Sequence, residues 1–193
     1  MDRGSADLIA TPSQTVGPFF HFGLADQTSL GCLVKPDTKG ERIRLIVKIF
    51  DGDGCAVPDS LIEIWQADAD GTYVRPSEPA DVSSPSGFCG FGRLATGADG
   101  SCTFETIRPG RVPAEHGVLQ ASHINVCLFA RGLLRQLYTR IYFAGDADLA
   151  TDPILGAVPE ARRSTLLAHP QANGEWSFDI RLQGNGETVF FDL

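Results

Sequence analysis

Residues 42–49 read Arg-Ile-Arg-Leu-Ile-Val-Lys-Ile, and this stretch decides the fold class. Apolar side chains occupy every second position: Ile43, Leu45, Val47 and Ile49. Arginine or lysine stands at the alternate positions 42, 44 and 48. Because successive side chains of a strand point to opposite faces, this alternation predicts a strand with one buried face.

Further strand-like segments, separated by turn residues, follow this one. We expect strands over 61–67, 102–107, 121–130 and 137–143, the last two as a pair in the core. A terminal hairpin is predicted in which 176–182 turns at Gly184-Asn185-Gly186 into 188–191. Only 159–168, with proline at its start, predicts a helix. About eight short strands and one short helix are typical of an all-β protein, here a two-sheet β-sandwich over residues 42–193.

Residues 1–41 differ from the rest of the chain. They show no regular hydrophobic period and are interrupted repeatedly by glycine and proline. We therefore expect an extended, irregular N-terminal arm. Phe19, Phe20 and Phe22 are too apolar to remain in water, so the arm should dock on a protein surface.

Composition excludes several classes of function. The 193 residues include 16 Lys or Arg and 24 Asp or Glu, a net charge of −8, so neither nucleic acid nor a membrane is an expected partner. No segment approaches the ~20 apolar residues of a membrane span, and the first residues lack an apolar secretion core, which predicts a soluble cytoplasmic protein. Five cysteines without a C-x-x-C pair predict buried or half-buried thiols rather than disulfides or zinc ligands.

Residues 122–132 carry the most informative chemistry. His123 and Asn125 share one face of a predicted strand, as two ligands of one metal would, although the second is an amide. A lone histidine on an apolar strand is more often a hydrogen-bonded structural residue, and we favour that interpretation. Arg131, at the end of the strand, is either a solvated surface charge or a guanidinium that binds a carboxylate through two N–H groups. No serine-hydrolase elbow, H-E-x-x-H motif or P-loop accompanies them.

Five motifs occur in order along essentially the whole chain: Thr11-Pro12-Ser13-Gln14-Thr15-Val16-Gly17-Pro18-Phe19, Ile64-Trp65-Gln66-Ala67-Asp68-Ala69-Asp70-Gly71-Thr72-Tyr73, Thr106-Ile107-Arg108-Pro109-Gly110, His123-Ile124-Asn125 and Gly184-x-Gly186-Glu187-Thr188-Val189-Phe190-Phe191. Together they resemble the intradiol ring-cleavage dioxygenases. The resemblance implies a β-sandwich subunit in an alpha–beta protomer, repeated in a larger hetero-oligomer. It also implies that the arm over residues 1–41 packs on the partner chain.

The resemblance also implies a division of labour between two chains. A beta chain holds a non-haem Fe(III) with two Tyr and two His, and the alpha chain is its iron-free relative. The four corresponding positions here are Ala80, Val112, His123 and Asn125. Alkyl and amide side chains offer no anionic oxygen to a hard ferric ion. We therefore expect this chain to bind no metal and to supply no catalytic residue. The Fe(III) would belong to a homologous beta subunit.

The resemblance further implies that five residues line the substrate pocket of the partner: Thr15, Gly17, Pro18, Phe19 and Arg131. Arg131 would face the carboxylate of protocatechuate (3,4-dihydroxybenzoate), which reacts with O2 to give 3-carboxy-cis,cis-muconate. Phe19 could equally be plain interface packing. Two alternatives stay open: a self-sufficient, catechol-type intradiol dioxygenase with its own iron, and a β-sandwich binding module without catalysis.

Overall fold

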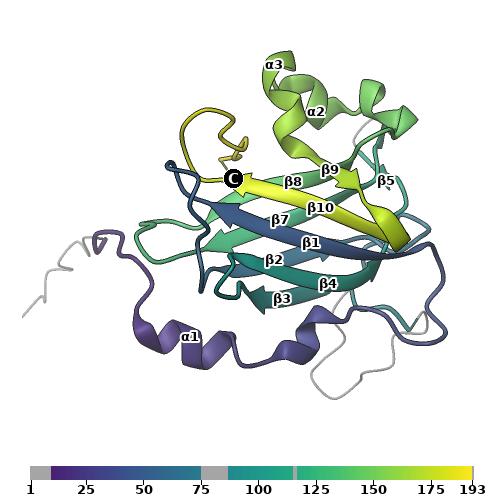
Figure 1. Ribbon diagram of the computed structural model, residues 1–193. Helices are drawn as coiled ribbons and strands as arrows, with labels where there is room; N and C mark the ends of the chain where they lie inside the picture. Colours follow the sequence, from purple (N-terminus) through teal and green to yellow (C-terminus); the bar gives the residue numbers. More distant parts are fainter. Residues whose placement is uncertain (1–9, 75–86, 115–116, 193) are drawn as a thin grey trace, which may run out of the picture.

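The computed structural model describes residues 10–74, 87–114 and 117–192. Its main feature is one eight-stranded sheet with the strand order β3-β2-β7-β8-β9-β10-β1-β4 (Figure 1). The strands are β1 (Arg42–Phe50), β2 (Leu61–Gln66), β3 (Phe91–Ala95), β4 (Ser101–Ile107), β7 (His123–Phe129), β8 (Leu137–Phe143), β9 (Leu167–Pro170) and β10 (Glu175–Arg181). A separate antiparallel pair consists of β5 (Val112–Pro113) and β6 (Leu119–Gln120).

The mainly β fold is confirmed, whereas the expected two-sheet sandwich is not confirmed. The short strand β9 pairs in parallel with β8 and antiparallel with β10, so it joins the four strands β3-β2-β7-β8 to the three strands β10-β1-β4 in one sheet. This sheet curves until its edge strands β3 and β4, connected by a turn at Gly97–Gly100, lie close together. The result is a nearly closed, barrel-like architecture. Alternation along a strand reports one buried face, but not how many sheets enclose the core.

Residues 32–34 of the expected arm belong to this barrel. The backbone N–H of Leu33 donates to Glu105 O of β4 at 2.8 Å, and Cys89 N–H, just before β3, donates to Leu33 O at 2.9 Å. The Leu33 side chain is 2% exposed and is part of the main core. The folded domain therefore includes residues that precede position 42.

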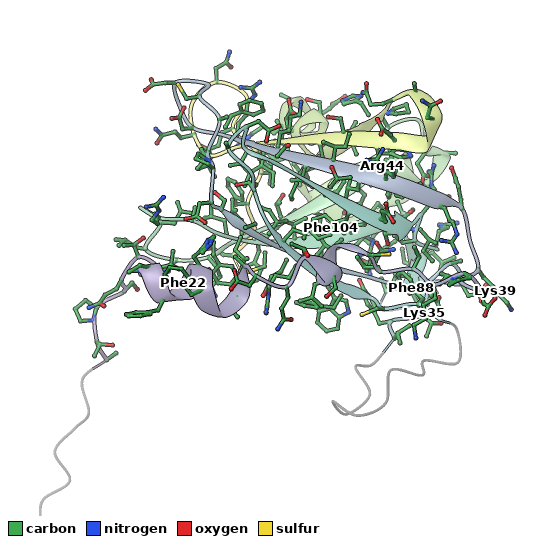
Figure 2. All side chains as sticks on the ribbon, turned by 60° about the horizontal axis from the view of Figure 1, so that its bottom comes forward. Phe22, Lys35, Lys39, Arg44, Phe88 and Phe104 are labelled. Atoms are coloured by element: carbon green, nitrogen blue, oxygen red, sulfur yellow. The ribbon has the colours of Figure 1, made fainter. Side chains whose placement is uncertain are left out.

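The core fills the inside of the curved sheet. The alternation predicted for β1 is confirmed, because its second, fourth, sixth and eighth residues are buried. β1 pairs in parallel with β10, which places Val47 opposite Phe178. The predicted core pair β7 and β8 is also confirmed, with Val126 opposite Thr139. Figure 2 shows Phe104 of β4 inside the sheet and Phe22 at the periphery.

Helices are more numerous and shorter than expected. The predicted helix over 159–168 is reduced to α3 (Glu160–Arg163) and a 3-10 turn (Ser164–Leu166), because Leu167 already begins β9. α2 (Pro153–Ala157) and α1 (Pro18–Leu24) were not anticipated. Further 3-10 turns cover Thr28–Gly31, Ala147–Thr151 and Ala172–Gly174. Within the described residues, no helix has the length and apolar character needed to cross a membrane.

The expected extended arm therefore contains a helix. Pro18 occupies its first turn, where a missing N–H costs nothing and the fixed φ suits a helix. Seven residues are too few to reveal a 3.6-residue period, so the pattern alone gives no signal. The Phe20 ring packs on Phe129 of β7 with 5.3 Å between ring centroids, and this contact holds the helix on the sheet.

The predicted terminal hairpin is wrong beyond its turn. Thr188 N–H donates to Arg181 O at 3.0 Å, so the chain does reverse at Gly184–Gly186. However, residues 188–191 do not continue along β10, which pairs with β1 on one side and, only at Trp176 and Ser177, with β9 on the other. The last residues cross instead to β8, where Phe191 N–H donates to Tyr138 O at 2.8 Å.

All five cysteines are free, as predicted, but their expected burial is only partly right. Cys102 is buried and Cys127 is half-buried, whereas Cys32, Cys55 and Cys89 are exposed. A cysteine on a strand or turn takes the face that the register assigns, and the residue type alone does not set it.

Candidate functional site

A groove beside α1 collects most of the predicted site residues. Gly17, in an extended conformation, precedes the helix, and the helix ends where Ala25 N–H donates to His21 O. Upstream of it, the Thr15 hydroxyl oxygen accepts from Gly132 N–H at 2.7 Å, which ties the arm to the turn between β7 and β8. The arm is therefore anchored on both sides of Gly17.

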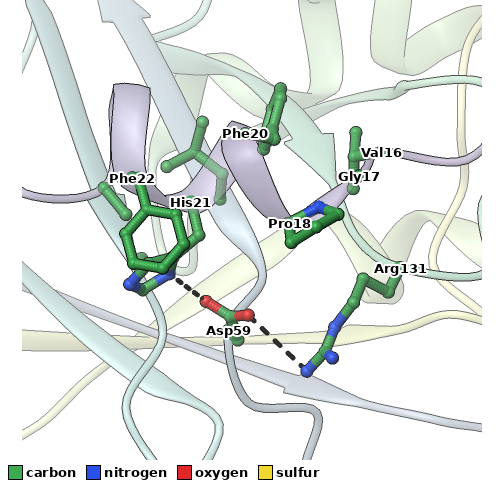
Figure 3. Close-up of a pocket in the computed structure, with 11 residues that line it drawn as sticks. Val16, Gly17, Pro18, Phe20, His21, Phe22, Asp59 and Arg131 are labelled. Carbon is green, nitrogen blue, oxygen red and sulfur yellow. Dashed lines mark hydrogen bonds and ion pairs between the residues drawn. The ribbon is translucent and has the colours of Figure 1, made fainter.

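The groove has a volume of about 520 Å³ (Figure 3). Its walls come from the arm and α1 on one side and from the ends of the sheet on the other. The lining residues are Val16, Gly17, Pro18, Phe20, His21, Phe22, Ala25, Asp59, Leu61, Ala95 and Arg131. Most of them are apolar, and the ionisable side chains among them are His21, Asp59 and Arg131. An apolar groove with few polar groups is typical of a site for a small molecule.

The three ionisable side chains meet at the Asp59 carboxylate. Its Oδ1 lies 2.5 Å from His21 Nδ1, and its Oδ2 lies 3.6 Å from a terminal guanidinium nitrogen of Arg131. The Arg131 side chain is 71% exposed. Because 3.6 Å exceeds the 2.7–2.9 Å of a charge-assisted hydrogen bond, Asp59 attracts the guanidinium without using up its five N–H donors. Arg131 can therefore bind a further anion in the groove.

The structure brings together four of the five predicted site residues. Gly17, Pro18 and Arg131 line the groove, and Thr15 fixes the arm next to it. Phe19 does not line the groove and is 85% exposed, as an interface side chain would be in the isolated chain.

Sequence reasoning missed His21 and Asp59. His21 is a single polar residue within an apolar run, and Asp59 follows a proline in a surface connection. Neither pattern predicts a partner, because the two residues are 38 positions apart and meet only after α1 docks on the sheet.

A second cluster surrounds His123 and Asn125 of β7, on the face that they were predicted to share. His123 is buried, and its Nδ1 lies 2.8 Å from Ala121 O. Since a carbonyl only accepts, Nδ1–H is the donor and Nε2 accepts from the Tyr73 hydroxyl at 3.3 Å. The same hydroxyl oxygen accepts from Asn125 Nδ2 at 2.9 Å. The cluster is a closed hydrogen-bond network.

The electrostatic environment keeps this imidazole neutral. Burial is the main cause that lowers the pKa of His123, and the positive charge of Arg140 lowers it further, to about 4. The hydrogen bond to Ala121 and the charge of Asp152 act in the opposite direction and are outweighed. At neutral pH His123 is thus an uncharged, hydrogen-bonded core residue.

Comparison with known proteins identifies the fold family. A family profile described as a dioxygenase matches residues 15–184, which is most of the chain. The chain belongs to the intradiol dioxygenase family.

Two curated relatives and one solved structure define its place within this family. The chain is 44% identical to the protocatechuate 3,4-dioxygenase alpha chain of Pseudomonas putida, over 96% of this chain and 98% of the relative. It is 36% identical to the protocatechuate 3,4-dioxygenase beta chain of Burkholderia cepacia, over 80% of this chain but only 64% of that relative. The dioxygenase domain of a carbohydrate-binding fusion protein from Streptomyces sp. SirexAA-E superposes with a TM-score of 0.63 at 30% identity, covering 90% of this chain and 98% of the other.

Intradiol dioxygenases depend on iron, and the described residues at the expected ligand positions do not fit a ferric ion. Of the four expected ligand positions, Ala80 lies outside the described residues and Val112 is a buried alkyl side chain. Asn125 offers an amide, and the Nε2 of His123 is engaged by Tyr73. A hard trivalent cation needs anionic oxygen ligands, which these positions do not supply. Among the residues that the structure describes, no group of three His, Cys, Asp or Glu could hold a metal.

Proposed function

We propose that this chain is the alpha chain of a protocatechuate 3,4-dioxygenase and works only in complex with a homologous beta chain that holds the Fe(III). The observation that carries the proposal is the extent of the match. The relative named as an alpha chain aligns over 98% of its length, whereas the beta chain aligns over only 64%. The unsuited donor set at Val112 and Asn125 supports the same assignment.

The proposed reaction of the complex inserts both atoms of O2 into protocatechuate. The ring opens between the two hydroxyl-bearing carbons, and the product is 3-carboxy-cis,cis-muconate. Substrate and O2 together contain all atoms of the product, so no external reductant is required. This chain contributes part of the pocket wall and no catalytic group.

The groove beside α1 supplies the residues for that wall. Gly17 and Pro18 present backbone and a compact ring, so a flat aromatic substrate can approach closely. Arg131 attracts the substrate carboxylate by a charge-assisted contact. This local positive charge is needed because the net charge of −8 repels an anionic substrate at longer range.

Exposed apolar side chains around the groove support a protein partner on this side. Phe19 and Phe22 of α1 and Leu134 in the turn between β7 and β8 are all more than half exposed. Burial of such apolar side chains under another protein removes them from water and lowers the free energy of the complex. In the proposal, the homologous beta chain covers them and meets the groove with its own pocket.

Co-expression with a beta chain tests the proposal. We expect the two chains to co-purify, the complex to contain iron and to consume one O2 per protocatechuate, and this chain alone to contain none. In the complex, Arg131→Ala should raise the KM for protocatechuate about ten-fold or more without changing the iron content. Stoichiometric iron and catechol cleavage by the isolated chain would refute the assignment.

A further inference from the structure

The connection between β1 and β2 holds Asp59 in an unusual backbone conformation. Among the described residues, Asp59 and Asn173 are the only non-glycine residues with positive φ, at 57° and 59°. Four hydrogen bonds with Thr96 hold the connection. Asp59 N–H donates to Thr96 O at 3.0 Å, and Ser60 N–H donates to Thr96 Oγ1 at 3.0 Å. Thr96 in turn donates its N–H to Ser60 O at 2.8 Å and its hydroxyl to Val57 O at 2.9 Å. The left-handed conformation is therefore enforced locally, and it aims the carboxylate into the groove (Figure 3).

The two carboxylate oxygens of Asp59 have separate tasks. Oδ1 is held by His21 of α1 at 2.5 Å, which fixes the orientation of the carboxylate. Oδ2 faces the guanidinium of Arg131 at 3.6 Å. Asp59 thus links three segments that are far apart in sequence: the helix of the arm, its own connection, and the turn after β7.

The interaction with Asp59 restricts the conformations of the Arg131 side chain. Its side chain is long and 71% exposed, and no other acidic side chain in the described part of the chain forms an ion pair with it. A free arginine of this kind populates many rotamers, and a ligand that binds it must first order it. The attraction of Asp59 reduces this cost in advance and keeps the guanidinium over the groove.

We propose that Asp59 is a positioning residue that holds Arg131 in place for the carboxylate of the substrate. This inference rests on the proposed function, in which Arg131 faces that carboxylate. Asp59 itself does not touch the substrate, and it acts through Arg131. It therefore contributes to the preference for carboxylated over uncarboxylated dihydroxybenzenes, and not to the ring-opening step.

Asp59→Asn in the alpha–beta complex tests the role. Asparagine keeps the shape of the side chain and tolerates positive φ, but it lacks the charge that attracts Arg131. We expect the KM for protocatechuate to rise about three- to ten-fold with kcat within about two-fold, because the substrate must now order Arg131 itself. The inhibition constant of catechol, which has no carboxylate, should stay unchanged. Equal effects on both compounds, or tighter binding of protocatechuate, would overturn the proposal.

A double-mutant cycle separates positioning from other effects. In the background of Arg131→Ala, Asp59→Asn should cause no further rise in KM, because the residue through which it acts is gone. A full additional effect would overturn the proposal. If the wild-type complex did not cleave protocatechuate, the proposed function itself would fall, and this inference with it. An active complex in which only Arg131→Ala has an effect would overturn the positioning role alone.

Two further variants guard the interpretation. Asp59→Gly adopts φ 57° without strain and also removes the carboxylate, so it carries the same prediction if Asp59→Asn does not assemble. Glu175→Gln is the matched control, since it breaks an exposed ion pair with Arg44 at 2.5 Å on the strand pair β1–β10. The control should leave both the KM for protocatechuate and the inhibition constant of catechol unchanged.

Discussion

Lowering the pH from 7.5 to 5 will destabilise the folded chain through His123. Burial and the charge of Arg140 lower the pKa of this imidazole to about 4 in the fold. In the unfolded chain the pKa returns to about 6.5. Between these values the unfolded chain binds a proton that the folded chain does not, so the free energy of unfolding falls as the pH falls.

The size of the effect follows from the gap between the two pKa values. A gap of about 2.5 pH units, at 1.36 kcal/mol for each unit, amounts to about 3 kcal/mol once the pH is below both pKa values. At pH 5 about 2 kcal/mol of this loss is expected, and at pH 7.5 almost none. Such a loss is a large fraction of the stability of a typical domain.

Urea unfolding of the chain at both pH values measures the loss, with His123→Gln as the reference. Carboxylates titrate alike in both proteins, so their contribution cancels in the comparison. We expect the wild type to lose about 2 kcal/mol more than His123→Gln between pH 7.5 and 5. NMR titration of the imidazole gives the same pKa without a variant. Parallel pH profiles of the two proteins, or a measured pKa near 6.5, would refute the reasoning.

Two further predictions concern stability. Leu33→Ala should lower the free energy of unfolding in urea by about 2–5 kcal/mol, because it opens a cavity in the core. The control Leu134→Ala, at an exposed position, should change it by less than about 0.5 kcal/mol, and equal effects of the two variants would place residue 33 outside the domain. Asp152→Ala should lower the free energy of unfolding, measured by heat or urea, by about 3 kcal/mol, because the Tyr142 hydroxyl and Ala121 N–H would both lose the buried carboxylate that accepts from them. A decrease of less than about 1 kcal/mol would contradict a stabilising role of these hydrogen bonds.

The face that each strand buries was predictable because it depends on local alternation. In β1 every second residue enters the core, and the pattern Ile43, Leu45, Val47 and Ile49 shows this without any knowledge of the partner strands. The motifs that carry the family resemblance are local as well. Residues 15–184 match the family profile, which agrees with the order of these motifs along the chain.

Strand pairing was not predictable in the same way. The segment 188–191 has a turn and an alternating neighbour, yet after the backbone hydrogen bond from Thr188 to Arg181 it leaves β10 and crosses to β8. Residues 167–170 form β9 rather than the end of a helix, because they lie between β8 and β10, where both backbone edges find partners. Competition for hydrogen-bonding edges is a property of the whole sheet.

Some residues of the candidate site were predictable from the sequence, and others were not. Gly17, Pro18 and Arg131 were found through motifs, whereas Asp59 and His21 were not. The Asp59 carboxylate reaches its two partners only because α1 docks through Phe20 and because Thr96 holds the connection at positive φ.

The amino-acid sequence alone determined which faces are apolar, where turns form and to which family the chain belongs. Only the tertiary structure decided that the two parts of the sheet join through β9, that residues 32–34 pair beside β4, and that His21, Asp59 and Arg131 meet in one groove. The physical reason is that alternation and turn chemistry act between neighbours in the chain, whereas edge pairing and charge contacts depend on distances that exist only after folding.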